Sequence, residues 1–118
     1  MLRVLIVDDH PDFRGLASRV LASSGFAVVG QAADAAEALA EVHRLRPDVV
    51  LLDVVLPDRS GIAVARQLAT SSDGPRVVLI SSRSRSDFGD SFEWPQRCSF
   101  LPKHQLSPTR LRDVLADL

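Results

Sequence analysis

Five short runs of mostly apolar residues recur along the chain, and several of them are rich in β-branched side chains. The runs lie at residues 2–7, 26–29, 49–52, 77–80 and 99–101. Short uninterrupted apolar runs are typical of strands that are buried on both faces of a sheet. We therefore predict five interior strands at these positions.

Four segments between and after these runs have the period of an amphipathic helix. Boundary residues agree with this: Asp34 and Glu37 have capping-box spacing, Pro47 closes the second helix, and Ser107 followed by Pro108 opens the last. The predicted inner faces are Phe13, Leu16, Ala17, Val20 and Leu21; Ala35, Ala38, Leu39, Val42 and Leu45; Ile62, Ala65, Leu68 and Ala69; and Leu111, Val114, Leu115 and Leu118.

Strands and helices alternate along the chain, and this predicts an α/β fold. Right-handed crossovers then give a parallel sheet that is covered by helices on both faces. Ligands of such sheets bind at the carboxyl ends of the strands. The polar residues expected at these ends are Asp8, Asp9, Asp53, Ser81 and Lys103.

The segment 82–97 departs from the alternation. It is polar, contains Gly89 and Pro95, and has little apolar periodicity. We expect a short or irregular fourth helix in this segment. Trp94 is expected to anchor an irregular loop there, although an exposed tryptophan would also suit a partner surface.

Size and charge narrow the possible functions. The 118 residues suit a single domain over 1–118, and a formal charge of −1 argues against direct binding to nucleic acid. No apolar stretch approaches the roughly 18 to 20 residues of a membrane helix. A single cysteine, Cys98, and the lack of a secretion signal predict a reducing, cytoplasmic setting.

Three carboxylates meeting at one sheet edge would repel one another unless a cation lay between them. We predict a Mg²⁺ site, with Asp9 and Asp53 as direct ligands, Asp8 acting through water, and the backbone carbonyl of Val55 completing the protein's share. Asp53 would attack phosphorus, while Mg²⁺ and Lys103 neutralise charge on the phosphoryl oxygens. The Ser81 hydroxyl would donate to another of these oxygens, with Ser82 as the alternative hydroxyl.

The motifs around these residues resemble the bacterial two-component response regulator receiver family over essentially the whole chain. They are the VDD at 7–9, the LLDVVLP at 51–57, the ISS at 80–82 and the FLPK at 100–103. The resemblance implies a flavodoxin-like, doubly wound five-stranded sheet in the order 2-1-3-4-5. It also implies a histidine kinase as phosphodonor and a protein that is not an enzyme beyond its own phosphorylation and slow dephosphorylation.

The resemblance further implies a switch. Phosphorylation would draw Ser81 toward the phosphoryl group, and Phe100 would turn inward, biasing a surface of the fourth helix, fifth strand and fifth helix. Phe100 as ordinary core is the alternative. The opening DHPDFR and the FLPK segment are most similar to the NarL/FixJ type, which often carries a carboxyl-terminal DNA-binding output domain of the LuxR kind. We expect none within 1–118. A homodimer through this surface is a further expected partner, although the irregular 82–97 segment departs from the surface that such a dimer uses.

Three other functions compete with this interpretation. They are a receiver-shaped scaffold that never takes phosphate, a magnesium phosphohydrolase, and a flavin-binding module. The complete set of site residues argues against the scaffold. Val55 stands where such a phosphohydrolase carries a second aspartate, and no Ser/Thr/Gly-rich loop follows the first strand to bind a flavin.

Two side chains near the acceptor bear on the lifetime of the phosphoryl group. Val55 is apolar and cannot orient water, and Arg83 is long enough to cover the phosphoryl oxygens. We therefore predict slow self-dephosphorylation. His10, His43, His104 and Cys98 lack metal-ligand spacing, and we expect them to be structural or solvent-facing.

Overall fold

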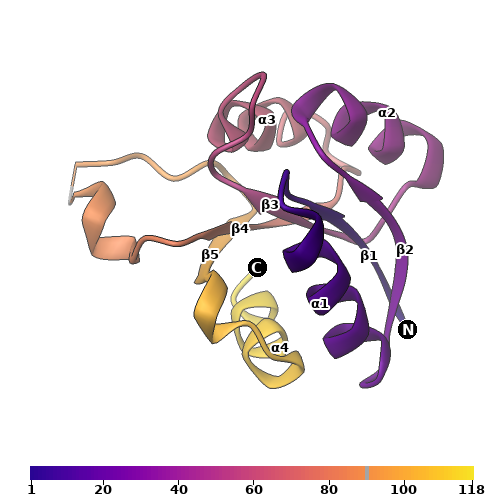
Figure 1. Cartoon of the computed structure of the whole chain (residues 1–118). Coiled ribbons are helices and arrows are strands. Elements are labelled where there is room, and N and C mark those ends of the chain that lie inside the picture. The colour runs from indigo at the N-terminus through magenta and orange to yellow at the C-terminus, as the bar shows by residue number, and fades with distance from the viewer. Residues whose placement is uncertain (90) are drawn as a thin grey trace.

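The computed structural model describes residues 1–89 and 91–118, and its centre is a parallel sheet of five strands (Figure 1). The strand order is β2-β1-β3-β4-β5, as the sequence resemblance implied. Each strand closely matches a predicted apolar run, with small extensions at its ends. The strands are β1 (Leu2–Val7), β2 (Phe26–Ala32), β3 (Val49–Asp53), β4 (Arg76–Ser81) and β5 (Cys98–Pro102).

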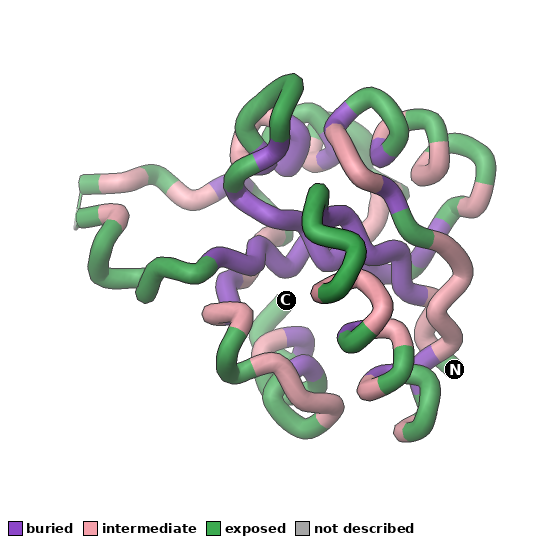
Figure 2. Tube along the Cα trace, viewed as in Figure 1, coloured by how far each residue is buried: buried purple, intermediate pink, exposed green. Residues whose placement is uncertain are grey.

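Helices cover both faces of the sheet. Figure 1 shows α1 (Pro11–Ala22) and α4 (Pro108–Ala116) on one face, with α2 (Ala35–Leu45) and α3 (Gly61–Leu68) on the other. Because successive strand residues point to opposite faces, each strand serves both layers. The buried strand residues form the centre of the molecule in Figure 2. The prediction of strands buried on both sides is confirmed for β1, β3 and β4, whereas the edge strands β2 and β5 are only partly buried.

The helix ends follow the predicted capping signals. The Asp34 carboxylate accepts a hydrogen bond from the backbone N–H of Glu37 at 2.8 Å, and the Ser107 hydroxyl accepts one from the backbone N–H of Arg110 at 3.1 Å. Helix α2 ends two residues before Pro47. These local contacts satisfy N–H groups that a helix leaves unpaired at its start.

Two leucines predicted to face inward do not. Leu16 is 52% exposed, because the buried side of α1 runs through Ala17 and Leu21, and a neighbouring position lies about 100° around the helix. Leu118 is 39% exposed, since α4 ends at Ala116 and the chain after it no longer follows the helical period.

The segment between β4 and β5 has no α-helix in its described part. It forms a single 3₁₀ turn, η1 (Arg85–Phe88), which agrees with the predicted short or irregular fourth helix; Asp90 lies outside the described residues. Phe88 and Trp94 are partly buried against the core, with ring centroids 5.5 and 5.4 Å from that of Phe100. Trp94 thus anchors the loop, as expected.

No helix in the described residues is long and apolar enough to cross a membrane.

Candidate functional site

The predicted site residues meet at the carboxyl edge of the sheet. Asp8 follows β1, Asp53 is the last residue of β3, Ser81 is the last residue of β4, and Lys103 follows β5 in the short 3₁₀ turn η2 (Lys103–Gln105). Strands β1 and β4 both pair with β3, so Asp53 lies between the other strand ends. Asp8, Asp53 and Ser81 are the buried polar residues of the described chain.

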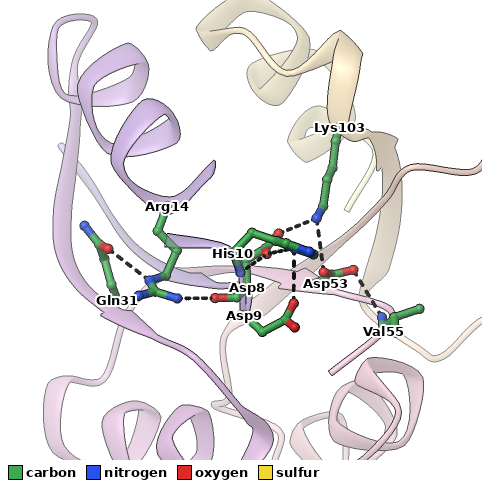
Figure 3. A network of polar contacts seen from close by, with 8 residues as sticks. All are labelled: Asp8, Asp9, His10, Arg14, Gln31, Asp53, Val55 and Lys103. Atoms are coloured by element: carbon green, nitrogen blue, oxygen red, sulfur yellow. Dashed lines mark hydrogen bonds and ion pairs between the residues drawn. The ribbon is translucent and has the colours of Figure 1, made fainter. Parts of the chain in front are cut away.

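Lys103 links two of the carboxylates. Its ammonium lies 2.6 Å from Asp8 Oδ2 and 3.1 Å from Asp53 Oδ2 (Figure 3). The same ammonium lies over the ring of Phe13. The distance from Nζ to the ring centroid is 4.9 Å, which is typical of a cation–π interaction. Burial lowers the pKa of Lys103, but the two carboxylates outweigh this and raise it overall, so the side chain stays charged.

Asp53 is held from both sides. Its Oδ1 accepts a hydrogen bond from the backbone N–H of Val55 at 3.1 Å, and its Oδ2 accepts one from Lys103. Burial is the largest cause of a raised Asp53 pKa, and the charge of Asp8 adds to it, while the Val55 and Lys103 contacts oppose it. The carboxylate is therefore fixed in position, but its contacts do not fully offset the cost of burying its negative charge.

Asp9 and His10 form the outer rim of the cluster. The Asp9 side chain is 39% exposed, and His10 Nδ1 lies 3.2 Å from its Oδ1 and 2.9 Å from Asp8 Oδ1. One ligand atom from each of Asp8, Asp9, His10 and Asp53 lies within 4.8 Å of all the others. We expected His10 to be structural or solvent-facing. Its ring is 67% exposed, but Nδ1 belongs to the cluster.

The cluster fits a divalent cation. The carboxylates of Asp8, Asp9 and Asp53 face the single ammonium of Lys103. The net charge of these four side chains is therefore minus two. Asp8 Oδ2 is buried and accepts no well-aligned hydrogen bond from the described residues, despite its close approach to Lys103. Lys103 also pairs with Asp53, so one ammonium serves two buried carboxylates. Carboxylate oxygens are the ligands that Mg²⁺ prefers.

Arg14 supports the site from α1. Its guanidinium donates to the backbone carbonyl of Asp8 at 2.6 Å and to the side-chain oxygen of Gln31 at 3.2 Å (Figure 3). Gln31 in turn donates to Ser18 on α1. The sequence analysis did not predict this network. The one feature that could have indicated it is the position of Arg14, one helical turn after His10.

The remaining candidate residues lie as follows. Ser81 is buried and its hydroxyl accepts the backbone N–H of Arg83 at 3.0 Å, whereas Ser82 is exposed. Val55 is 69% exposed beside Asp53, and Phe100 is buried. Burial raises the pKa of the Cys98 thiol to about 12, so this cysteine stays protonated.

Replacing Asp53 by Asn is expected to stabilise the metal-free protein at neutral pH. A carboxyl with a raised pKa binds more protons in the folded state than in the unfolded state, so its contribution to stability falls as the pH rises through that pKa. The free energy of unfolding should increase by roughly 1 kcal/mol on substitution, the lower end for a poorly compensated buried group. Urea denaturation in the presence of a metal chelator measures the free energy of unfolding of both proteins. The difference between them should become smaller as the pH is lowered toward about 4.

Asp58 provides a control with the opposite sign. Its carboxylate accepts the backbone N–H groups of Ala35 and Ala36 at the start of α2, at 2.8 and 3.0 Å. The Ala35 contact is the largest cause of its lowered pKa, so its stabilising effect is present at neutral pH and lost as the pH falls through that pKa. Asp58→Asn should therefore destabilise the protein at neutral pH. A stability change of the same sign in both variants would contradict the explanation for Asp53.

Comparison with known proteins gives consistent matches. A model of the response regulator receiver domain matches residues 4–115. The chain is 48% identical over 82 residues to protein-glutamate methylesterase/protein-glutamine glutaminase 5 of Myxococcus xanthus, covering 69% of this chain and 24% of that protein. It is 42% identical over 87 residues to the DNA-binding response regulator MtrA of Mycolicibacterium smegmatis, covering 72% of this chain and 37% of that protein. The chain thus spans well under half the length of these relatives.

Solved structures agree with these matches. The signal receiver domain of the response regulator NarL from Mycobacterium tuberculosis superposes with a TM-score of 0.81 at 34% identity, covering 98% of this chain and 94% of that one. The response regulator TrrA from Thermotoga maritima, in complex with Mg(2+)-BeF, superposes with a TM-score of 0.80 at 25% identity, covering 99% and 98%.

Proposed function

Because this chain belongs to the response regulator receiver domain family, we propose that Asp53 is the residue that accepts the phosphoryl group. The domain is a phosphorylation-dependent signalling switch of a two-component system. The observation that carries the proposal is the placement of Asp53: its carboxylate is buried at a strand end, 3.1 Å from the Lys103 ammonium and beside Asp8 and Asp9.

The side chains at this edge suit phosphoryl transfer. An Asp53 oxygen attacks the phosphorus of a phosphohistidine, the P–N bond breaks, and the imidazole leaves with the electron pair and takes up a proton. Lys103 is placed to contact the phosphoryl oxygens and compensate their charge. Mg²⁺, when bound, supplies further positive charge, and Asp9, Asp53 and the Val55 carbonyl would hold it, with Asp8 acting through water.

We propose that the signal passes through Ser81 and Phe100. Ser81 would shift from its present hydrogen bond with Arg83 toward the phosphoryl oxygens. Phe100 already points into the core and packs on the rings of Phe88 and Trp94, so a change near Ser81 would reach the described part of the 82–97 segment. In this segment η1 stands where the short or irregular fourth helix was predicted.

The partners follow from the same assignment. We propose a histidine kinase as phosphodonor and an output partner joined to or contacted by the receiver. The match to MtrA, a DNA-binding response regulator, supports a transcriptional output. The matched segment is a minor part of MtrA and of the Myxococcus xanthus relative, which leaves room in both for further domains. The proposed chemistry of residues 1–118 is phosphoryl transfer alone. A homodimer and a cytoplasmic location stay predictions.

Incubation with a small acyl phosphate and Mg²⁺ tests the function. Intact-mass spectrometry should show the mass increase of one phosphoryl group, and the label should be lost on exposure to base, as expected for an acyl phosphate. Trp94 fluorescence should also change on adding beryllofluoride with Mg²⁺. An unchanged mass would contradict the proposal and favour the phosphate-free scaffold.

Val55→Asn and Arg83→Ala are each expected to shorten the life of the phosphoryl group. Val55 is exposed beside Asp53, and the backbone of Arg83 contacts Ser81, so both side chains start next to the path of an attacking water. We expect the decay rate to rise by about tenfold, equivalent to about 1.4 kcal/mol of barrier. Decay of the phosphorylated mass over time measures it.

Arg85→Ala is the matched control, because the Arg85 guanidinium lies over the Trp94 ring at 4.8 Å from its centroid. Its decay rate should equal that of the wild type. Unchanged decay in both Val55→Asn and Arg83→Ala would refute the prediction.

A further inference from the structure

His10 is held at the rim of the acidic cluster by the chain itself. It is the residue before α1, in an extended conformation with φ −94° and ψ 107°, and Pro11 begins the helix after it. Its backbone N–H donates to Asp8 Oδ1 at 2.8 Å. The backbone at this position is thus tied to one of the buried carboxylates that the metal site requires.

The imidazole is directed at the space between the carboxylates. Nδ1 lies 2.9 Å from Asp8 Oδ1 and 3.2 Å from Asp9 Oδ1, and both contacts are drawn in Figure 3. The ring is 67% exposed, so Nε2 can carry its proton toward water. In the metal-free site Nδ1 donates to these carboxylates, which only accept. With the proton on Nε2 instead, a metal ion can take the place of the Nδ1 proton, and Nδ1 then offers its lone pair as a ligand.

We propose that His10 Nδ1 is a ligand of the metal in the acidic site and that it raises the preference of the site for borderline divalent ions such as Mn²⁺ over Mg²⁺. This inference rests on the metal site of the proposed function and adds a nitrogen donor to it. Imidazole suits transition-metal ions, whereas Mg²⁺ takes oxygen ligands almost exclusively. A nitrogen ligand shifts the site's preference without removing its oxygen donors.

The spacing of the ligand atoms allows this coordination. Atoms from Asp8, Asp9, His10 and Asp53 lie within 4.8 Å of one another. Two ligands on opposite sides of one ion, each with a bond of about 2.1 Å, are about 4.2 Å apart. Small side-chain movements therefore suffice to bring Nδ1 and carboxylate oxygens onto one ion. The excess negative charge of the cluster favours a divalent one.

Pulsed electron paramagnetic resonance with Mn²⁺ alone tests the proposal. The wild-type spectrum should contain the modulation of an imidazole nitrogen, and His10→Gln should lack it. His43→Gln, in α2, and His104→Gln, in η2 beside Lys103, are the controls and should keep it. Calorimetric titrations should show the ratio of Mn²⁺ to Mg²⁺ affinity falling about tenfold in His10→Gln alone, a change of about 1.4 kcal/mol.

The outcomes separate this inference from the proposed function. Bound Mn²⁺ without nitrogen modulation, no Mn²⁺ binding, or an unchanged affinity ratio in His10→Gln overturns the nitrogen ligand. Phosphoryl uptake by the wild-type protein with Mg²⁺ decides the function of Asp53 independently. Circular dichroism of His10→Gln checks that the variant is folded, so a lost signal reports the ligand and not the fold.

Discussion

Asp53→Asn is expected to abolish phosphoryl uptake completely. The amide keeps the shape of the side chain but is a far weaker nucleophile than the carboxylate, and it removes one of the proposed metal ligands. The other carboxylates cannot replace Asp53: Asp8 is fully buried and bound by Lys103 and His10, and Asp9 lies at the exposed rim. Intact-mass measurement with a small acyl phosphate and Mg²⁺ should show no adduct.

Asp12→Asn serves as the matched control for this loss. Asp12 is an exposed aspartate in the first turn of α1, near the site but outside the acidic cluster. It should take up the phosphoryl group as the wild type does. An adduct that persists in Asp53→Asn would place the acceptor elsewhere and refute the assignment of the site.

Gly61→Ala is expected to damage both stability and the site. A Cβ at Gly61 would overlap the backbone carbonyl oxygen of Asp53 and lie 2.8 Å from its carbonyl carbon. The Gly61 N–H also donates to the Val54 carbonyl at 2.8 Å, so the start of α3 cannot simply move away. We expect a loss of about 3 kcal/mol or more in the free energy of unfolding, seen as a fall of roughly 10 °C in Tm.

The same substitution should slow phosphoryl uptake. The backbone that must yield belongs to Asp53, and displacing a reacting group by about 1 Å can cost on the order of 100-fold in rate. Calorimetry gives Tm, and the rate of adduct formation at a temperature where the variant is folded gives the second effect. A normal rate in a destabilised variant would show that α3 moves and the site does not.

Gly15→Ala is the control for Gly61→Ala. Gly15 lies inside α1, where a Cβ would meet Arg19 Nη1 at 3.5 Å, an ordinary contact. Alanine in a helix interior should stabilise the protein by roughly 0.5 to 1 kcal/mol. Opposite signs for the two glycines would show that the clash at Asp53, and not the loss of a glycine, is the cause.

The positions of the strands and of the buried carboxylates could be read from the sequence. Continuous apolar runs distinguish buried strands from helices, whose apolar residues recur every three to four positions. The alternation of such strands with helices then predicts a parallel sheet. All carboxyl ends of such a sheet lie along one edge. Asp8 and Asp53 are therefore brought together by topology, whichever side-chain conformations they adopt. The irregular segment after β4 could also be predicted, since it lacks the apolar period that an amphipathic helix needs.

Contacts that depend on rotamers and loop paths needed the tertiary structure. Nothing in its spacing marks His10 as part of the cluster, because its role depends on how the chain turns from β1 into α1. The contact of Phe13 with Lys103 joins segments far apart in the chain, and the crowding of Gly61 against Asp53 depends on the path of the loop between β3 and α3. The sequence by itself determined which groups gather at the sheet edge, since the parallel direction of the strands follows from its pattern and their order from the family that its motifs resemble. The folded structure alone decided which atoms touch there, because those distances depend on packing between residues that no local pattern relates.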